Sequence, residues 1–240
     1  MNSCLVIPCY NEAPRLKGEA LLAFLEQRPD FTLLLVDDGS QDATWARIEE
    51  LTKKHSRLKG LRLSHNQGKA EAVRQGTLQA LQSPDLKFVG YFDADLATPL
   101  AEADRMLRYF HDHPAYQIIL GSRLKKLGNK IQRLASRHVL GRIFATVVSS
   151  MLRLPVYDTQ CGAKLFRAPK ARELFAKPFV SPWFFDVELL ARHQLGNGRA
   201  DEVFEMPLKE WTHVPGSKLR AKDYLSVPFE LFKIWRTYFF

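Results

Sequence analysis

The feature that most constrains the fold of this chain is a regular alternation of short apolar runs with segments of helical periodicity over its first half. The apolar runs have the length of β-strands and cover residues 4–7, 31–36, 58–63, 88–92 and 117–120. Segments with apolar residues at helical spacing lie between them, at residues 16–25, 42–54, 69–81 and 100–110. This alternation is typical of a parallel sheet with helices on both faces. The sequence therefore predicts an α/β fold with a doubly wound, mostly parallel sheet.

Polar residues follow four of these runs, at residues 8–12, 37–40, 66–69 and 93–95. The carboxyl ends of parallel strands lie along one edge of a sheet, where open α/β sheets bind ligands. The chain has neither the Gly-x-Gly-x-x-Gly pattern of dinucleotide-binding enzymes nor the Gly-Lys-Ser/Thr of a phosphate loop. We therefore expect one polar site at this edge, in a protein of another class.

The run at residues 88–92 leads directly to two carboxylates, Asp93 and Asp95. Alternate residues of an extended segment point the same way, so both acids can face one point. Thr98 and Pro99 then predict a helix start with a hydroxyl cap. Carboxylate oxygens are the ligands that Mg²⁺ or Mn²⁺ takes beside a phosphate. An isolated Asp-x-Asp is often only a polar turn, but the other polar strand ends favour a metal site here.

Most of the formal net charge of +9 comes from one block of the chain. Residues 121–157 hold no acid and eight basic residues: Arg123, Lys125, Lys126, Lys130, Arg133, Arg137, Arg142 and Arg153. Such a block predicts an anionic target, which is a phosphate group, a membrane surface or a nucleic acid. The block lies on an apolar helical pattern at residues 131–154 and contains no known reader motif, so we do not expect nucleic-acid binding.

The remaining features indicate a protein of a reducing compartment that sits on a membrane. The three cysteines have no metal-binding or redox spacing, and no apolar run reaches the 18–20 residues of a spanning helix. Residues 224–240 are rich in aromatic residues and include two cations, which is typical of an interfacial amphipathic helix. We expect a cytoplasmic protein, peripheral on the inner face of a membrane, held by residues 131–154 and 224–240 or by a membrane-protein partner.

With these pieces in order, the chain resembles the family-2 glycosyltransferases of GT-A fold. Within that family it is most similar to the dolichyl-phosphate and polyprenyl-phosphate β-glucosyltransferases and mannosyltransferases. The resemblance runs from about residue 4 to 218 and rests on the motifs Val6-Ile7-Pro8-Cys9-Tyr10-Asn11-Glu12, Val36-Asp37-Asp38-Gly39-Ser40, Gly68-Lys69, Asp93-Ala94-Asp95, Gly121-Ser122-Arg123, Asp158-Thr159-Gln160-Cys161-Gly162 and Trp183-Phe184-Phe185-Asp186. It implies one catalytic domain at residues 1–218, with a nucleotide-sugar half (1–123) and an acceptor half (124–218), before an amphipathic segment at 219–240.

The resemblance also implies roles for individual residues. Nucleotide-sugar binding falls to Pro8, Tyr10, Glu12, Asp37, Asp38, Lys69 and Asp93, with Asp38 favoured over Asp37 as the acceptor of a base N–H. Asp95, together with Asp93, binds the Mg²⁺ or Mn²⁺ that bridges the diphosphate. Arg123, Arg133, Arg137 and Lys164 hold the phosphate of the acceptor. Solvated helix charges and ordinary turn residues remain the alternative for Lys69, for the arginines and for the Asp37-Asp38 pair.

The implied reaction is an inverting transfer of a hexose, glucose being favoured, from a UDP-sugar to polyprenyl or dolichyl phosphate, with a GDP-sugar as the less favoured donor. A phosphate acceptor is already ionised near neutral pH and needs no strong base. The alternative is transfer to a sugar or diacylglycerol hydroxyl in polysaccharide or glycolipid synthesis, which needs a carboxylate base. Asp158 and Asp186 are the candidates for that base. A basic membrane-binding or nucleic-acid-binding protein without turnover is the competing class, and the intact Asp-x-Asp argues against it.

Overall fold

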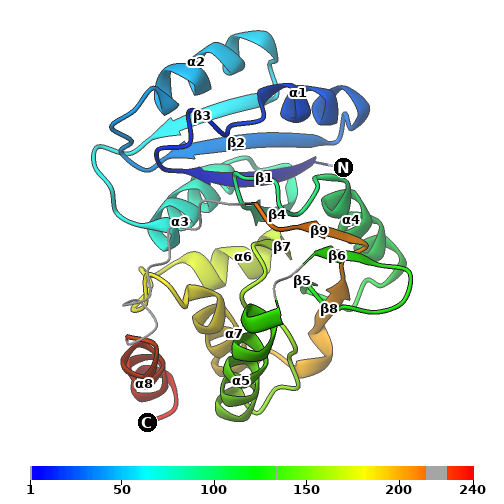
Figure 1. Cartoon of the computed structure of the whole chain (residues 1–240), viewed down its shortest axis with the longest axis vertical. Coiled ribbons are helices and arrows are strands. Elements are labelled where there is room, and N and C mark those ends of the chain that lie inside the picture. Colours follow the sequence, from blue (N-terminus) through cyan, green and yellow to red (C-terminus); the bar gives the residue numbers. More distant parts are fainter. Residues whose placement is uncertain (1, 133–134, 215–225) are drawn as a thin grey trace.

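The computed structural model describes residues 2–132, 135–214 and 226–240, with the backbone alone described at 135–140. One sheet has the strand order β3-β2-β1-β4-β7-β5-β8, and its elements are shown in Figure 1. Its strands are β1 (Asn2–Cys9), β2 (Phe31–Asp37), β3 (Leu58–Arg62), β4 (Leu86–Phe92), β5 (Ile118–Ser122), β7 (Ala163–Arg167) and β8 (Val203–Pro207). A second, two-stranded sheet pairs β6 (Lys130–Gln132) with β9 (Glu210–Thr212).

The pairing is mostly parallel, as the sequence predicts. Strand β1 pairs parallel with β2 and β4, β2 with β3, and β5 with β8. Strand β7 is the exception, because it runs antiparallel to both of its neighbours, β4 and β5. The doubly wound, mostly parallel sheet is confirmed, and the antiparallel strand in its middle is an addition to it.

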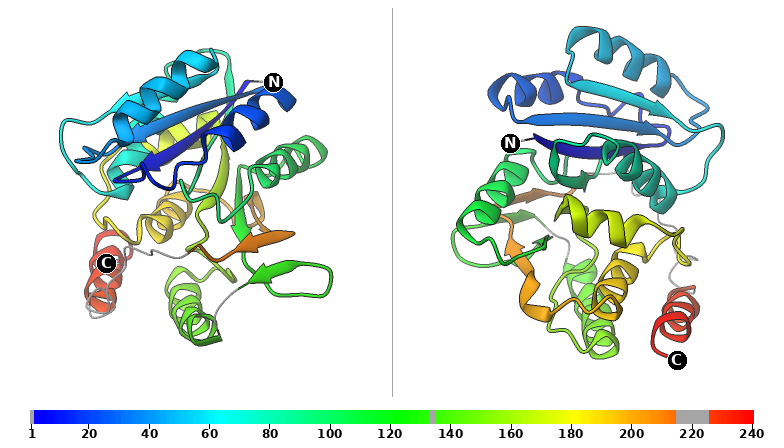
Figure 2. Two further views of the ribbon diagram at one scale, coloured as in Figure 1. Left: turned by 45° about the horizontal axis from the view of Figure 1, so that its top comes forward. Right: turned by 180° about the vertical axis from the view of Figure 1, so that it is seen from behind.

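The helices cover both faces of the sheet. They are α1 (Gly18–Gln27), α2 (Thr44–Lys54), α3 (Lys69–Ala80), α4 (Ala101–Asp112), α5 (Ala135–Leu152), α6 (Ala168–Phe175), α7 (Phe185–Leu195) and α8 (Val227–Tyr238), with a 3₁₀ turn at Ala200–Glu202. Helices α1 and α2 lie on one side of strands β1–β3 and α3 on the other (Figures 1 and 2).

The strands are apolar throughout because both of their faces are buried. In β1, Leu5 and Ile7 pack in the core beneath α1, α2 and α4, whereas Cys4 and Val6 pack in the core beneath α3, α6 and α7. All four side chains are at most 4% exposed. The two cores therefore pack against opposite faces of the sheet and hold the carboxyl ends of its parallel strands in place.

Two local predictions are wrong. The predicted hydroxyl cap of Thr98 is absent, because helix α4 begins at Ala101, within a residue of the expected start, and has Leu100 at its N-cap with no side-chain cap. The helical pattern predicted over 131–154 begins as strand, since Ile131 lies in β6 and pairs with Trp211. The helix itself, α5, starts at Ala135.

The C-terminal segment folds as the predicted amphipathic helix. Leu231 and Ile234 of α8 are buried in the same core as α3, α6 and α7. In the part of the chain that the structure describes, no helix combines the length and apolar character that crossing a bilayer requires. The division into halves at residue 123 stays a prediction.

Candidate active site

Asp93 and Asp95 lie in a tight turn at the carboxyl end of β4. The Leu96 N–H donates to the Asp93 carbonyl (3.1 Å), and the Ala97 N–H donates to Asp95 Oδ1 (2.9 Å). The two acids therefore lie in a turn rather than in the extended segment expected from the sequence. Burial raises the pKa of Asp95, and the negative charge of Asp93 raises it further. A carboxylate in this setting favours a nearby cation.

Gly162 lies directly against the side chain of Asp93. The Asp93 N–H donates to the Gly162 carbonyl (3.0 Å), which continues the antiparallel pairing of β4 with β7. A Cβ added to Gly162 would lie 1.9 Å from Asp93 Oδ2, far inside van der Waals contact. The residue before β7 thus lies against the carboxylate of Asp93, and any side chain at residue 162 would displace that carboxylate.

Lys69, the first residue of α3, brings a cation to the two acids. Its Nζ lies 2.6 Å from Asp93 Oδ1. Burial alone would lower the pKa of Lys69, but the surrounding carboxylates, Asp93 first among them, outweigh burial and raise the pKa above its usual range. Asp186 and Asp95 also contribute to that increase. The sequence left Lys69 between a site residue and a solvated helix charge, and the structure places it among three acids.

Asp38 is 3% exposed and holds the loop that leads to Lys69. Its two oxygens accept the N–H groups of Gln67 (2.7 Å) and Gly68 (2.9 Å). Burial raises the pKa of Asp38, although these two amides oppose the increase. Gly39, with φ +64°, permits the close approach, because a Cβ there would lie 2.4 Å from the His65 backbone. Asp38 therefore has a positioning task that the sequence did not reveal.

Asp37, the other member of the pair, is completely buried and accepts the Ser40 N–H at 3.1 Å. Its second oxygen lies 3.5 Å from Arg62 Nε. Both acids at the end of β2 thus accept hydrogen bonds from backbone N–H groups of neighbouring loops.

The segments that follow β1 and β2 are cross-linked into one rim beside these acids. The Asn11 N–H donates to Ser40 Oγ (2.9 Å), and Asn11 Oδ1 accepts the Gln41 N–H (2.9 Å). Glu12, 7% exposed, accepts two hydrogen bonds from Arg15 (2.8 and 2.9 Å). Tyr10 of the same segment is half-buried, as is Pro8 at the end of β1.

Arg123 and Asp158, for which the sequence predicted separate roles, form an ion pair. Arg123 Nε and Nη2 donate to the two Asp158 oxygens at 2.7 and 2.8 Å. Burial would lower the pKa of Arg123, but Asp158 outweighs it and raises the pKa above its usual range. The guanidinium also lies 5.5 Å from the ring of Trp211, and Glu205 accepts the backbone N–H of Asp158 at 2.6 Å. Sequence reasoning left the role of Trp211 undecided and missed Glu205, which stands near no recognisable motif.

Lys164 does not fit its predicted role as a ligand of the acceptor phosphate. Its side chain has no exposed surface, and its ammonium donates to the carbonyls of Thr159 (2.9 Å) and Cys161 (2.7 Å) and to Asp186 (2.5 Å). These three bonds use all three N–H groups, so none remains for a phosphate. Asp186 also accepts a hydrogen bond from the buried Tyr91 hydroxyl. The lysine is a buried structural residue of β7.

Two further predicted phosphate ligands cannot be placed. Arg133 and the side chain of Arg137 lie outside the described residues. Of the same basic block, Arg142 packs on Tyr157, with its guanidinium carbon 3.8 Å from the ring centre.

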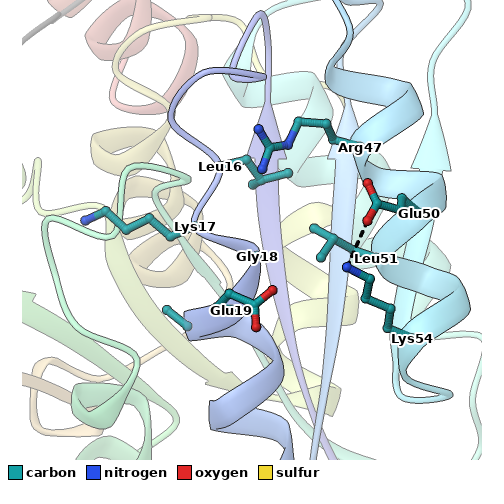
Figure 3. Close-up of a pocket in the computed structure, with 9 residues that line it drawn as sticks. Leu16, Lys17, Gly18, Glu19, Arg47, Glu50, Leu51 and Lys54 are labelled. Carbon is teal, nitrogen blue, oxygen red and sulfur yellow. Dashed lines mark ion pairs between the residues drawn. The ribbon is translucent and has the colours of Figure 1, made fainter.

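A surface hollow of about 430 Å³ lies elsewhere, between the start of α1 and helix α2 (Figure 3). It is lined by Leu16, Lys17, Gly18, Glu19, Ala20, Arg47, Glu50, Leu51 and Lys54. None of these is a predicted site residue, and Glu50 and Lys54 already form an ion pair at 2.8 Å. The chemistry at the strand ends therefore lies outside this hollow.

Solved structures define the class of fold to which this sheet and its acidic edge belong. The glucosyl-3-phosphoglycerate synthase of Mycobacterium tuberculosis, crystallised with Mn²⁺, UDP-glucose and phosphoglyceric acid, matches 98% of this chain with a TM-score of 0.71, at 17% identity and over 80% of its own chain. A complex of the same enzyme with Mn²⁺, UDP and glucosyl-3-phosphoglycerate matches with a TM-score of 0.68, at 18% identity, over 98% of this chain and 76% of its own. The fold is that of a GT-A glycosyltransferase.

Sequence comparison gives the family. Residues 4–175 match glycosyl transferase family 2, and the chain belongs to that family. It is 36% identical to the dolichyl-phosphate beta-glucosyltransferase of Drosophila melanogaster, over 98% of this chain and 74% of that protein. The dolichyl-phosphate beta-glucosyltransferase of Homo sapiens is 32% identical over 90% of this chain and 68% of its own length. The resemblance stated from the motifs is thus confirmed.

Proposed function

We propose that this glycosyltransferase moves glucose from UDP-glucose to a polyprenyl or dolichyl phosphate at a membrane surface, with inversion at the anomeric carbon. The observation that carries the proposal is the cluster of Lys69, Asp93 and Asp95 at the carboxyl end of β4, in a chain that is 36% identical to a dolichyl-phosphate beta-glucosyltransferase. A UDP-sugar is favoured over a GDP-sugar because the named relatives are glucosyltransferases and the matching structures hold UDP-glucose.

Asp93 and Asp95 fit a divalent cation. Both are carboxylates, the hard ligands that Mg²⁺ and Mn²⁺ take, and burial and the charge of Asp93 raise the pKa of Asp95, an increase that a bound cation would oppose. When bound there, the cation offsets the charge that develops on the leaving diphosphate. Lys69 adds a permanent positive charge on the same side of the turn. The proposal includes a divalent cation, Mg²⁺ or Mn²⁺, held by Asp93 and Asp95.

The rim formed by the segments after β1 and β2 is the proposed seat of the nucleoside. Pro8, Tyr10 and Glu12 would line it, and Asp38 would accept a base N–H with a lone pair that the Gln67 and Gly68 amides leave unused. Asp37, completely buried beneath the rim, supports it. The cross-links between the two segments hold the rim in place before the nucleotide arrives.

The surroundings of Asp158 and Asp186 favour a phosphate acceptor over a hydroxyl. Asp158 is bound by Arg123 through two hydrogen bonds, and Asp186 is bound by Lys164 and Tyr91. A carboxylate neutralised by a cation is a weak base, whereas an acceptor phosphate already carries the nucleophilic oxygen in ionised form. Arg123 would meet that phosphate through Nη1, which takes no part in its two side-chain bonds to Asp158. Arg133 and Arg137 are proposed to assist.

The test measures UDP release from UDP-glucose with Mg²⁺, with and without polyprenyl phosphate, for the wild type and Asp95→Ala. The proposal expects release that depends on the lipid phosphate and that falls by roughly 10³-fold or more in the variant. Asp201→Asn is the matched control, because Asp201 is an exposed acid paired only with Arg199 among the described residues. UDP release that does not depend on the lipid phosphate but increases with a sugar or diacylglycerol acceptor would show that the acceptor is a hydroxyl instead. No release and no UDP-glucose binding would refute the proposal.

A further inference from the structure

Helix α8 carries an exposed aromatic face. Five rings on α8 and the two residues after it are exposed: Phe229 (76%), Phe232 (56%), Trp235 (38%), Phe239 (36%) and Phe240 (95%). They are not scattered, since the ring centres of Phe232 and Trp235 lie 5.9 Å apart and those of Trp235 and Phe240 lie 5.6 Å apart. A contiguous aromatic patch on a protein surface marks an interaction site.

The opposite side of the helix is firmly attached to the protein, so the aromatic face cannot turn inward. Leu231 and Ile234 are buried in the core. The Tyr238 hydroxyl donates to Glu188 Oε1 (2.6 Å) and accepts from Arg192 Nε (3.0 Å), and Arg192 Nη2 also donates to that same Glu188 oxygen (2.7 Å). Glu188 is completely buried. This triad of the buried Glu188 and the half-buried Arg192 and Tyr238, here called the α8 anchor, fixes the orientation of α8.

The exposed charges of α8 indicate which kind of surface its aromatic face can bind. The exposed residues of α8 include two cations, Lys233 and Arg236, and no acidic side chain. The patch thus combines phenylalanine and tryptophan rings with positive charge, the combination that enters the headgroup layer of an anionic bilayer. A helix of 12 residues is about 18 Å long, which suits a position on the bilayer rather than across it.

We propose that the outer face of α8 docks on an anionic phospholipid bilayer, with the rings of Phe232 and Trp235 entering the headgroup layer and Lys233 and Arg236 contacting lipid phosphates. Helix α5 packs on α7, as α8 does, and lies with it at the end of the molecule away from α2 (Figure 1). There α5 exposes Ile143 and Val147, which continues the apolar character of that end.

The α8 anchor also connects this face with the active site. The second oxygen of Glu188 accepts the N–H groups of Val180 (2.9 Å) and Ser181 (3.2 Å). The next residue, Pro182, lies near Gly68, because a Cβ built on that glycine would come within 4.0 Å of Pro182 Cβ. Gly68 immediately precedes the Lys69 of the acidic cluster. A bilayer that holds α8 therefore holds the active site at a defined orientation.

The experiment measures binding to vesicles of phosphatidylcholine alone and of phosphatidylcholine with roughly one third phosphatidylglycerol, by sedimentation of the full chain without any sugar donor. The wild type is expected to bind the anionic vesicles, with a blue shift of tryptophan fluorescence. Phe232→Glu with Trp235→Glu should weaken binding by about tenfold or more. Neutralising Lys233 and Arg236 with glutamine should weaken binding by about fivefold for each charge. Lys53→Glu is the control, because Lys53 is an exposed residue of α2, at the end of the molecule away from α8 (Figure 1), and the change shifts the net charge by as much as the aromatic double variant does, so binding should stay unchanged.

Three outcomes overturn the proposal: no binding to anionic vesicles, binding by the aromatic double variant equal to that of the wild type, or binding lost equally in the Lys53→Glu control. A self-association that the double variant abolishes, without vesicle binding, would assign the face to a second copy instead. UDP-glucose binding, measured by calorimetry on the same samples, separates this inference from the proposed reaction. Vesicle binding without nucleotide binding would refute the reaction and leave the docking surface in place.

Discussion

Replacing Gly162 by alanine tests the contact on which the acidic cluster depends. The new Cβ would lie 1.9 Å from Asp93 Oδ2 and 2.2 Å from Asp93 Cγ. Ordinary contact begins near 3.4 Å, so the carboxylate would have to move by about 1.5 Å, or the β4–β7 pairing would have to open. Because Asp93 Oδ1 is 2.6 Å from Lys69 Nζ, a displacement of that size breaks the ion pair and misplaces the proposed metal ligand.

A misplacement of about 1 Å at a reacting centre costs on the order of 10² in rate. We therefore expect Gly162→Ala to lower UDP release by roughly 10²-fold and to weaken UDP-glucose binding, and overpacking should lower the free energy of unfolding by about 1–3 kcal/mol. Unfolding is followed by urea denaturation, and activity and binding are measured below the transition.

The matched control is Gly128→Ala. Gly128 has φ +85°, so alanine there is strained by roughly 1 kcal/mol, but nothing lies within 4 Å of its added Cβ. It should lose stability without losing activity. Wild-type activity and affinity in Gly162→Ala, or an equal loss in both variants, would refute the reasoning.

Three further perturbations follow from the buried charges. Burial raises the pKa of Asp95 above the usual 3.8, so ionisation of this side chain lowers the stability of the folded protein as the pH rises. Asp95→Asn should therefore raise the melting temperature of the metal-free protein at pH 7, and this gain should shrink as the pH falls towards 3.8. A gain that grows on acidification would contradict the prediction. Lys164→Met leaves Asp186 buried without its cation and should lower the free energy of unfolding by about 3–5 kcal/mol in urea. Lys54→Met removes an exposed pair and should leave the free energy of unfolding nearly unchanged, and equal losses in the two variants would contradict the burial argument. Tyr238→Phe removes the hydroxyl of the α8 anchor and should cost about 2 kcal/mol in the same assay, and an unchanged midpoint would mean that the anchor adds no stability.

The sequence predicted the parts of the fold that local patterns determine. The strands β1–β5 and helices α1–α4 lie within a few residues of the expected ranges, because each is a continuous apolar run or a clear helical repeat. The position of Asp93 and Asp95 at the end of β4 follows from the same patterns.

The missed features depend on pairs that are distant in the chain. Strand β7 reads Ala-Lys-Leu-Phe-Arg, and Lys164 in its middle obscures the strand, because its charge is satisfied only by partners that the fold brings together. Arg123 and Asp158 are 35 residues apart, so each could be assigned a separate role from its motif, although they form one ion pair. The contact of Gly162 with Asp93 is visible only once the antiparallel register is known.

The place of β7 in the sheet has a consequence for the order in which the protein can form during synthesis. Because β7 lies between β4 and β5, a nascent chain that ends at residue 123 has made both of these strands but not the one that joins them. Strand β4 then presents an open edge, and β5 lacks both of its neighbours. The contact of Gly162 with Asp93 can form only after β7 has been made, so a nascent chain of 123 residues exposes a strand edge of the kind that chaperones protect.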